Sequence, residues 1–153
     1  MQTSFLLTEK ESRLPQAYNV LGMAVSLKIA ASDTNGQMSL FTAENHKNQG
    51  PPLHRYDVDE TFYITEGEFF FQMGEDRFFA VAGDTLFVPR NMTHAFLTIS
   101  ETGKMLFMVN PTGNVEKLFE KLSSYQQIPS VEDIVSVHAA LGLTILGPPL
   151  THA

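Results

Sequence analysis

Residues 18 to about 110 form a series of short alternating segments separated by turn residues, and this pattern limits the chain to few folds. The first segment has apolar residues at every second position, with Ser26 and Lys28 between them, as in a half-buried strand. These apolar residues are Leu21, Met23, Val25, Leu27 and Ile29. A second strand is predicted at Met38–Thr42, after the turn residues 33–36.

Six further strands are predicted, each bounded by Gly, Asp, Glu or Thr residues typical of turns. They are roughly Thr61–Thr65, Phe69–Met73, Arg77–Val81, Thr85–Val88, Ala95–Ile99 and Met105–Val109. No helical pattern separates these segments, which argues against a parallel α/β sheet. Closely spaced short strands instead predict an all-β sandwich or barrel.

The C-terminal part of the chain changes to helical spacing. A first stripe consists of Val115, Leu118, Phe119 and Leu122. A second helix is predicted to begin at Ser130, with Asp133 placed for a capping contact, and to end at Gly142. Its predicted apolar face consists of Ile134, Val135, His138 and Leu141. We therefore predict one domain over residues 1–153, with a barrel core at about 18–110 and C-terminal helices at about 114–142.

Composition excludes several classes of protein. The chain has no cysteine, so disulfides, iron–sulfur ligation and thiol nucleophiles are excluded, and a bound metal would need nitrogen and oxygen ligands. Ten basic and seventeen acidic residues give a net charge of −7, which disfavours nucleic acid as a partner. No apolar run approaches the roughly 18 residues of a membrane span, and residues 1–9 lack the features of a signal peptide. A cytoplasmic protein is expected.

Two segments carry the residues best suited to metal chemistry. Residues two apart on a strand face the same side, so His54 and Tyr56 are predicted to point into the barrel together. Glu60 follows after a short polar turn, and His94 follows the turn that begins at Pro89. Two imidazoles and one carboxylate match the ligand set typical of non-haem iron, and they also suit manganese, nickel or zinc. We predict a divalent transition metal held by His54, Glu60 and His94.

The spacing of these residues resembles the two motifs of the cupin superfamily. In the first motif His54, Glu60 and Gly67 fit, with three residues between Tyr56 and Glu60 and six between Glu60 and Gly67. The second motif is matched by Gly83, Pro89 and His94. The resemblance implies a double-stranded β-helix, the jelly-roll barrel of cupins, with a C-terminal helical appendage.

Three positions depart from the cupin motifs. Tyr56 stands where the family has a second histidine, Asn91 replaces a glycine, and Thr98 replaces the final asparagine. A phenol must lose its proton to bind a divalent ion well, so the ligand set is reduced to His54, Glu60 and His94. Asn91 is among the residues that tolerate the left-handed turn conformation a glycine would adopt.

The segments around Gly50–His54 and residues 62–69, together with the closing residues 147–150, resemble single-domain bacterial cupins related to quercetin 2,3-dioxygenase. In that group the glutamate is both a metal ligand and a base toward the flavonol hydroxyl. The resemblance implies that Glu60 is the catalytic base. Tyr56 either orients the substrate, occupies a weak fourth ligand position, or lines the barrel as a simple aromatic residue.

Sequence context also predicts the positions of two other histidines and of the phenylalanines. His46 lies in a polar run and is interpreted as an exposed loop residue, with a folded-over loop that supplies the missing ligand as the alternative. His138 is interpreted as a packed or interface histidine. Neighbouring residues in Phe69–Phe71 and Phe78–Phe79 point to opposite faces, so one apolar face needs a cover. Either the C-terminal helices or a second subunit would provide it, and we predict a homodimer.

Three functions remain open from the sequence. The first is a metal-dependent, dioxygenase-like oxidoreductase acting on a small aromatic or enolisable molecule. The second is a sensor or carrier that holds a small ligand after loss of the metal through the change at Tyr56. The third is a metal-dependent isomerase or epimerase of sugars, although the Phe- and Met-rich barrel supplies few of the polar groups that sugars need.

Overall fold

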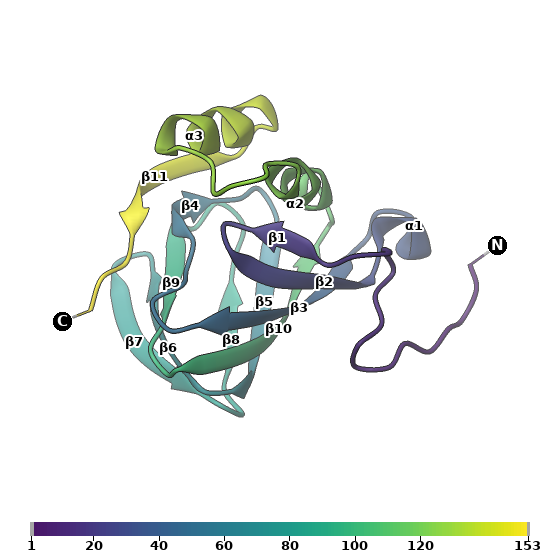
Figure 1. Cartoon of the computed structure of the whole chain (residues 1–153), viewed down its shortest axis with the longest axis horizontal. Helices are drawn as coiled ribbons and strands as arrows, with labels where there is room; N and C mark the ends of the chain where they lie inside the picture. Colours follow the sequence, from purple (N-terminus) through teal and green to yellow (C-terminus); the bar gives the residue numbers. More distant parts are fainter. Residues whose placement is uncertain (1, 153) are drawn as a thin grey trace.

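The computed structural model describes residues 2–152 and places most of the chain in two antiparallel sheets that enclose a common interior (Figure 1). The six-stranded sheet has the order β1-β2-β3-β10-β5-β8. Its strands are β1 (Tyr18–Val20), β2 (Met23–Ile29), β3 (Ser39–His46), β5 (Asp59–Glu66), β8 (Thr85–Val88) and β10 (Thr102–Asn110). The five-stranded sheet has the order β11-β4-β9-β6-β7. Its strands are β4 (Pro52–Arg55), β6 (Glu68–Met73), β7 (Asp76–Val81), β9 (His94–Thr98) and β11 (Thr144–Pro149).

The alternating sequence pattern determines which side chains fill the interior. On β10, every second residue is buried while its neighbours are partly exposed, as expected for a strand with one face on the core. Fully buried aromatic and aliphatic residues from both sheets meet in the interior. The largest are Phe41, Phe69, Phe71, Leu27, Ile64 and Met105. The prediction of an all-β jelly-roll barrel with C-terminal helices is confirmed.

Strand β11 is not among the elements predicted from the sequence. Its residues were correctly placed outside a helix, because Pro148 and Pro149 cannot continue one. They nevertheless pair with β4 at the edge of the five-stranded sheet. The register shifts after Ile145 and again after Gly147. An edge position with an interrupted ladder tolerates prolines, which have no N–H to donate.

The two predicted C-terminal helices are present and lie over one end of the barrel (Figure 1). Helix α2 (Val115–Ser123) buries the four apolar residues of the predicted stripe. Helix α3 (Val131–Ala140) begins where expected, because the Ser130 hydroxyl accepts a hydrogen bond of 3.1 Å from the backbone N–H of Asp133. The predicted end is also correct, since Gly142 has a positive φ of 74° just beyond the helix.

The predicted buried face of α3 was partly wrong. His138 is buried, but Val137 is the second buried residue, and Val135 is 42% exposed. Apolar residues occur on both sides of this helix, so its hydrophobic pattern alone does not select a face. Contacts with α2 and β11 select the side that carries Val137 and His138.

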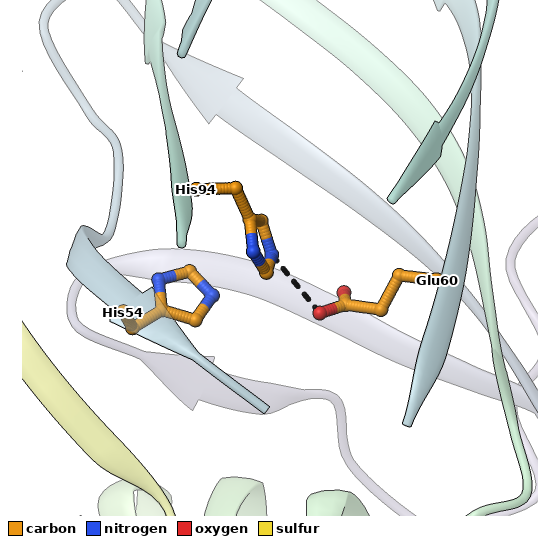
Figure 2. Close-up of side chains that lie close together, drawn as sticks. All are labelled: His54, Glu60 and His94. Carbon is orange, nitrogen blue, oxygen red and sulfur yellow. Dashed lines mark ion pairs between the residues drawn. The ribbon is translucent and has the colours of Figure 1, made fainter. Parts of the chain in front are cut away.

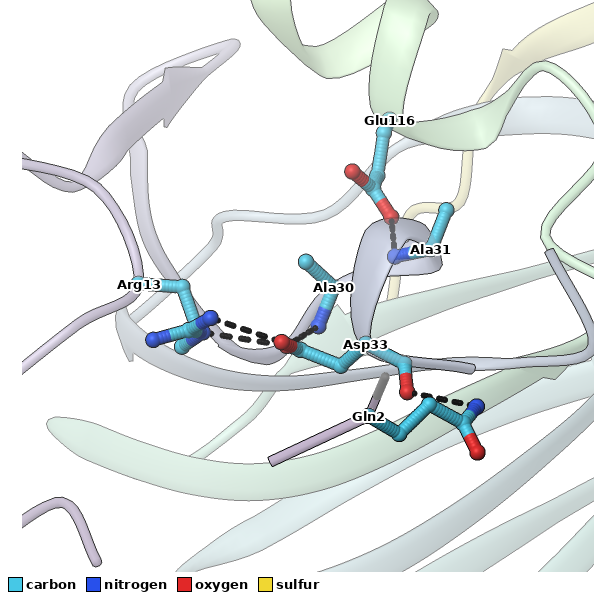
Figure 3. Close-up of polar contacts among 6 residues, drawn as sticks. All are labelled: Gln2, Arg13, Ala30, Ala31, Asp33 and Glu116. Atoms are coloured by element: carbon cyan, nitrogen blue, oxygen red, sulfur yellow. Dashed lines mark hydrogen bonds and ion pairs between the residues drawn. The ribbon is translucent and has the colours of Figure 1, made fainter. Parts of the chain in front are cut away.

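A cluster of polar contacts connects the N-terminal segment, α1 (Ala31–Thr34) and α2 (Figure 3). The Arg13 guanidinium donates two hydrogen bonds to Asp33, at 2.6 and 3.0 Å, and lowers the pKa of that carboxyl. Glu116 of α2 accepts a hydrogen bond of 2.7 Å from the backbone N–H of Ala31 and another from the Ser39 hydroxyl. These hydrogen bonds attach helix α2 to α1 and to the start of β3, in addition to the apolar contacts of its buried face.

The C-terminal helices do not cover the outer face of the β6–β7 hairpin. The His152 ring lies there instead, 5.2 Å from the ring centroids of both Phe70 and Phe79. Four large apolar side chains of β5, β7 and β8 stay between 44% and 56% exposed. They are Tyr63, Phe79, Val81 and Phe87. Among the helices of residues 2–152, none is long and apolar enough to cross a bilayer.

Candidate metal centre

Three strands bring His54, Glu60 and His94 together inside the barrel (Figure 2). His54 on β4 and His94 on β9 are directly opposite each other in the antiparallel pairing, and their ring centroids are 4.2 Å apart. Glu60 reaches them from β5 in the other sheet. All three side chains are buried. The structure therefore unites the three residues that the sequence predicts as metal ligands.

The spacing of the three residues fits one metal ion. Each offers a ligand atom, and these atoms all lie within 4.8 Å of one another. Nε2 of His94 and Oε1 of Glu60 approach to 3.0 Å, yet neither atom makes a hydrogen bond of acceptable geometry among the described residues, and both are buried. Such unsatisfied buried atoms are costly unless a cation or another partner satisfies them. A nitrogen and oxygen ligand set with this spacing suits a divalent transition metal.

Backbone carbonyls fix the orientation of both imidazoles. Nδ1 of His54 lies 2.7 Å from the carbonyl oxygen of Pro52, and Nδ1 of His94 lies 3.0 Å from that of Met92. A carbonyl only accepts, so Nδ1 of each ring carries the proton in these contacts and the neutral ring has its lone pair on Nε2. Metal-binding histidines commonly donate their second N–H in this way. The two rings are thus oriented before a metal binds.

Burial and the neighbouring charges act differently on the two histidines. The pKa of His54 is lowered well below its usual value, first by burial and then by the proximity of His94. Burial also acts to lower the pKa of His94, but the charge of Glu60 and its contact with the ring outweigh burial, so the pKa is raised. His54 therefore offers a free lone pair at neutral pH, whereas a metal must compete with a proton for His94.

Tyr56 lies beside the ligand group. Its ring centroid is 4.4 Å from that of His54, and the residue is 8% exposed. The pKa of Tyr56 is raised well above 10, first by burial and then by the charge of Glu60. Its phenol therefore stays protonated at neutral pH, which favours a hydrogen-bond donor over a phenolate ligand. The side chain also lines the cavity described below, as the aromatic alternative predicted.

The turn before His94 is attached to the segments that carry the other two candidate ligands. Asn91 has a φ of 67°, as predicted for the position where cupins have glycine, and its N–H donates to the Tyr56 carbonyl at 2.7 Å. The neighbouring Arg90 forms a 3.1 Å ion pair with Asp59, the residue before Glu60. The loop that leads to His94 is thereby attached to the beginning of the strand that carries Glu60.

A cavity of about 50 Å³ opens next to the three candidate ligands. Its wall is mainly apolar, with contributions from the β1–β2 turn, both sheets and helix α2. Apolar lining residues include Val20, Met23, Val25, Phe62, Phe107 and Phe119. A cavity that combines apolar walls with a few polar groups is the usual form of a small-molecule site.

His138 also lines this cavity, a role the sequence did not predict. It is 3% exposed, as a packed histidine would be, but its ring faces Tyr56 with 6.3 Å between centroids and 24° between planes. Only the tertiary placement of α3 reveals this position, since His138 is outside both motifs. His46, in contrast, is exposed at the end of β3 and is not part of the ligand group, so the alternative of a folded-over loop was wrong.

Comparisons with known proteins agree with the barrel architecture. Residues 40–110 match the family model of the cupin domain. No curated protein matches the chain by sequence.

Among solved structures, a predicted oxalate decarboxylase from Thermotoga maritima is 15% identical and has a TM-score of 0.62, covering 70% of this chain and 99% of its own. An RmlC-like cupin from Shewanella frigidimarina is 21% identical, with a TM-score of 0.58 over 72% of this chain and 95% of its own. A polyketide cyclase from Streptomyces resistomycificus is 19% identical, with a TM-score of 0.57 over 72% of this chain and 80% of its own. At these identities the neighbours establish fold and leave function open. The family model that matches residues 40–110 and the fold shared with these structures agree with the resemblance of both motifs to cupins.

Proposed function

We propose that this protein is a metal-dependent oxidoreductase that acts on a small aromatic or enolisable molecule, with dioxygen as co-substrate. The observation that carries the proposal is the position of His54, Glu60 and His94 at the wall of a mainly apolar cavity. Three protein ligands on one side leave coordination positions for a substrate, and an apolar wall favours an apolar ligand.

Each residue of the centre has its own role in the proposed reaction. His54, Glu60 and His94 would hold the metal, which would supply Lewis-acid stabilisation of an ionised oxygen. Glu60 takes the proton of the substrate hydroxyl, because it is the carboxylate of the ligand group and lines the cavity that would hold the substrate. Tyr56, protonated, donates a hydrogen bond that orients the substrate. Both atoms of dioxygen enter the product, so that dioxygen is reduced, the substrate is oxidised and no external reductant is needed.

The resemblance to quercetin 2,3-dioxygenase-like cupins supports the same chemistry for flavonols or related enols. The apolar wall is consistent with the flat hydrophobic rings of such molecules. A sugar isomerase is less well supported, because sugars need several polar contacts and few polar side chains line the cavity.

Metal analysis and dioxygen uptake test this proposal. Protein purified without a histidine tag or chelator should contain about one equivalent of a transition metal. The variant His94→Ala should lose it, whereas His46→Ala, which changes an exposed histidine, should retain it. Dioxygen consumption should then be measured against a panel of flavonols and simpler enols. A metal-loaded protein that consumes no dioxygen with any of them would contradict the oxidative reaction.

A small-molecule sensor or carrier is the second candidate, and the replacement of a ligating histidine by Tyr56 favours it. The raised pKa of Tyr56 opposes metal binding by its oxygen and leaves three ligands. A folded, metal-free protein that binds aromatic molecules in the cavity would support this function over the enzyme.

A further inference from the structure

His138 is a fourth histidine at the cavity, outside the metal ligand group. The group whose ligand atoms lie within 4.8 Å of one another contains His54, Glu60 and His94 but not His138. His138 nevertheless lines the same cavity, and its ring faces that of Tyr56. The Tyr56 ring also contacts His54, with 4.4 Å between the two ring centroids. The place of His138 suggests contact with a ligand rather than with the ion.

The hydrogen bond at Nδ1 determines what His138 offers to the cavity. Nδ1 lies 2.7 Å from the carbonyl oxygen of Ile134, one turn earlier on α3. Because that carbonyl accepts, Nδ1 carries the proton and the neutral ring has its lone pair on Nε2. Within residues 2–152, Nε2 of His138 has no hydrogen-bond partner. The ring therefore presents a hydrogen-bond acceptor at a wall that is otherwise mainly apolar.

We propose that Nε2 of His138 accepts a hydrogen bond from a hydroxyl group of the bound molecule, other than the oxygen that meets the metal ligands. The substrate class is thereby narrowed to small aromatic molecules with two oxygen functions, at least one of them a hydroxyl donor. This inference rests on the proposed function for the presence of a ligand in the cavity. An acceptor at a mainly apolar wall selects for a ligand that satisfies it, since a ligand without a donor excludes water and leaves the acceptor unpaired.

Simple phenols test the inference without turnover. The probes are catechol, resorcinol and hydroquinone, each compared with its monomethyl ether, which has similar shape but one donor fewer. Dissociation constants are measured anaerobically by calorimetry on the zinc-loaded protein. At least one diphenol should bind about tenfold more tightly than its ether. His138→Phe should abolish this preference, His138→Gln, which retains an acceptor, should restore part of it, and His46→Phe should leave it unchanged.

The outcomes separate this inference from the proposed function. A hydroxyl preference that survives in His138→Phe, or no preference in the unmodified protein, overturns the role of His138. Loss of zinc from both His138 variants also overturns it, because His138 would then act on the metal. The same pairs are measured on metal-free protein. If the His138-dependent preference persists there while no transition metal is retained, the hydroxyl contact stands and the metal-dependent function fails. Circular dichroism confirms that each variant is folded.

Discussion

Two parts of the barrel interior are equally buried but differ in what fills them, and strand β5 passes through both. Its inward residues are Glu60, Phe62 and Ile64, which are 3%, 3% and 0% exposed. Ile64 belongs to the cluster of buried aromatic and aliphatic side chains. Around Glu60 the neighbours are histidines beside a cavity of about 50 Å³. The first part, called here the packed part, is stabilised by burial, whereas the second, the cavity part, retains unsatisfied polar atoms.

The packed part consists of aromatic rings in mutual contact. Phe71 is fully buried, and its ring centroid lies 6.4 Å from that of Phe69 and 6.2 Å from that of Phe78. In the cavity part, Oε1 of Glu60 and Nε2 of His94 lack hydrogen bonds. Buried polar atoms without partners reduce stability, and proteins commonly retain them where function requires it. The packed part therefore stabilises the fold by burial, whereas the cavity part holds the polar groups that the proposed function would use.

The largest expected effect is the loss of a ring from the packed part. Phe71→Ala should lower the free energy of unfolding by about 3–5 kcal/mol, because it removes buried surface and leaves a cavity among rigid neighbours. Chemical denaturation monitored by circular dichroism measures the change. Val131→Ala, at a side chain that is 77% exposed, is the control and should change stability by about 0.5 kcal/mol or less. A similar loss in both variants would remove the distinction between filled interior and surface.

Substitution in the cavity part should change the free energy of unfolding in the opposite direction. In metal-free protein, the double variant Glu60→Leu/His94→Leu should raise the free energy of unfolding by about 1–4 kcal/mol, because it replaces unsatisfied buried polar groups with apolar ones of similar volume. The same variant should bind no transition metal. A destabilised double variant would mean that the Glu60–His94 contact supports the fold, contrary to the comparison.

The sequence was sufficient for the barrel and the ligand triad but not for the rest of the site. Alternation and turn residues reveal strands because burial on one face imposes a period of two, and motif spacing locates His54, Glu60 and His94. Strand β11 was missed because its prolines carry no strand signal, and pairing with β4 depends on the edge position. His138 was assigned to packing because the orientation of α3 is set by contacts with α2 and β11, which the pattern of one helix does not specify.

The pH dependence of metal affinity tests the charge state of the cavity part. The pKa of His94 is raised and that of His54 is lowered, so His94 is the histidine that a metal must deprotonate. Below the pKa of His94, the affinity for cobalt(II) should fall about tenfold for each unit that the pH is lowered, because one proton is displaced per ion. Absorption titration from pH 8 to pH 6 measures this slope. An affinity independent of pH across that range would contradict the assignment of His94 as a ligand protonated in the metal-free protein.

The smallest expected effect concerns the outer surface beside the packed part, where the exposed residues Tyr63, Phe79, Val81 and Phe87 lie on strands β5, β7 and β8. We propose that a second copy of the chain covers this surface, because β7 and β8 each lie at one edge of their sheet and both carry exposed apolar side chains. Sedimentation at micromolar concentration should detect a homodimer. Phe87→Glu should shift it toward monomer by about tenfold in dissociation constant, since a charge would be buried at the interface. Val135→Glu, an exposed position on α3, is the control and should leave the dimer intact. If the unmodified protein sediments only as a monomer, the aromatic surface has another role and the packed part is complete within one chain.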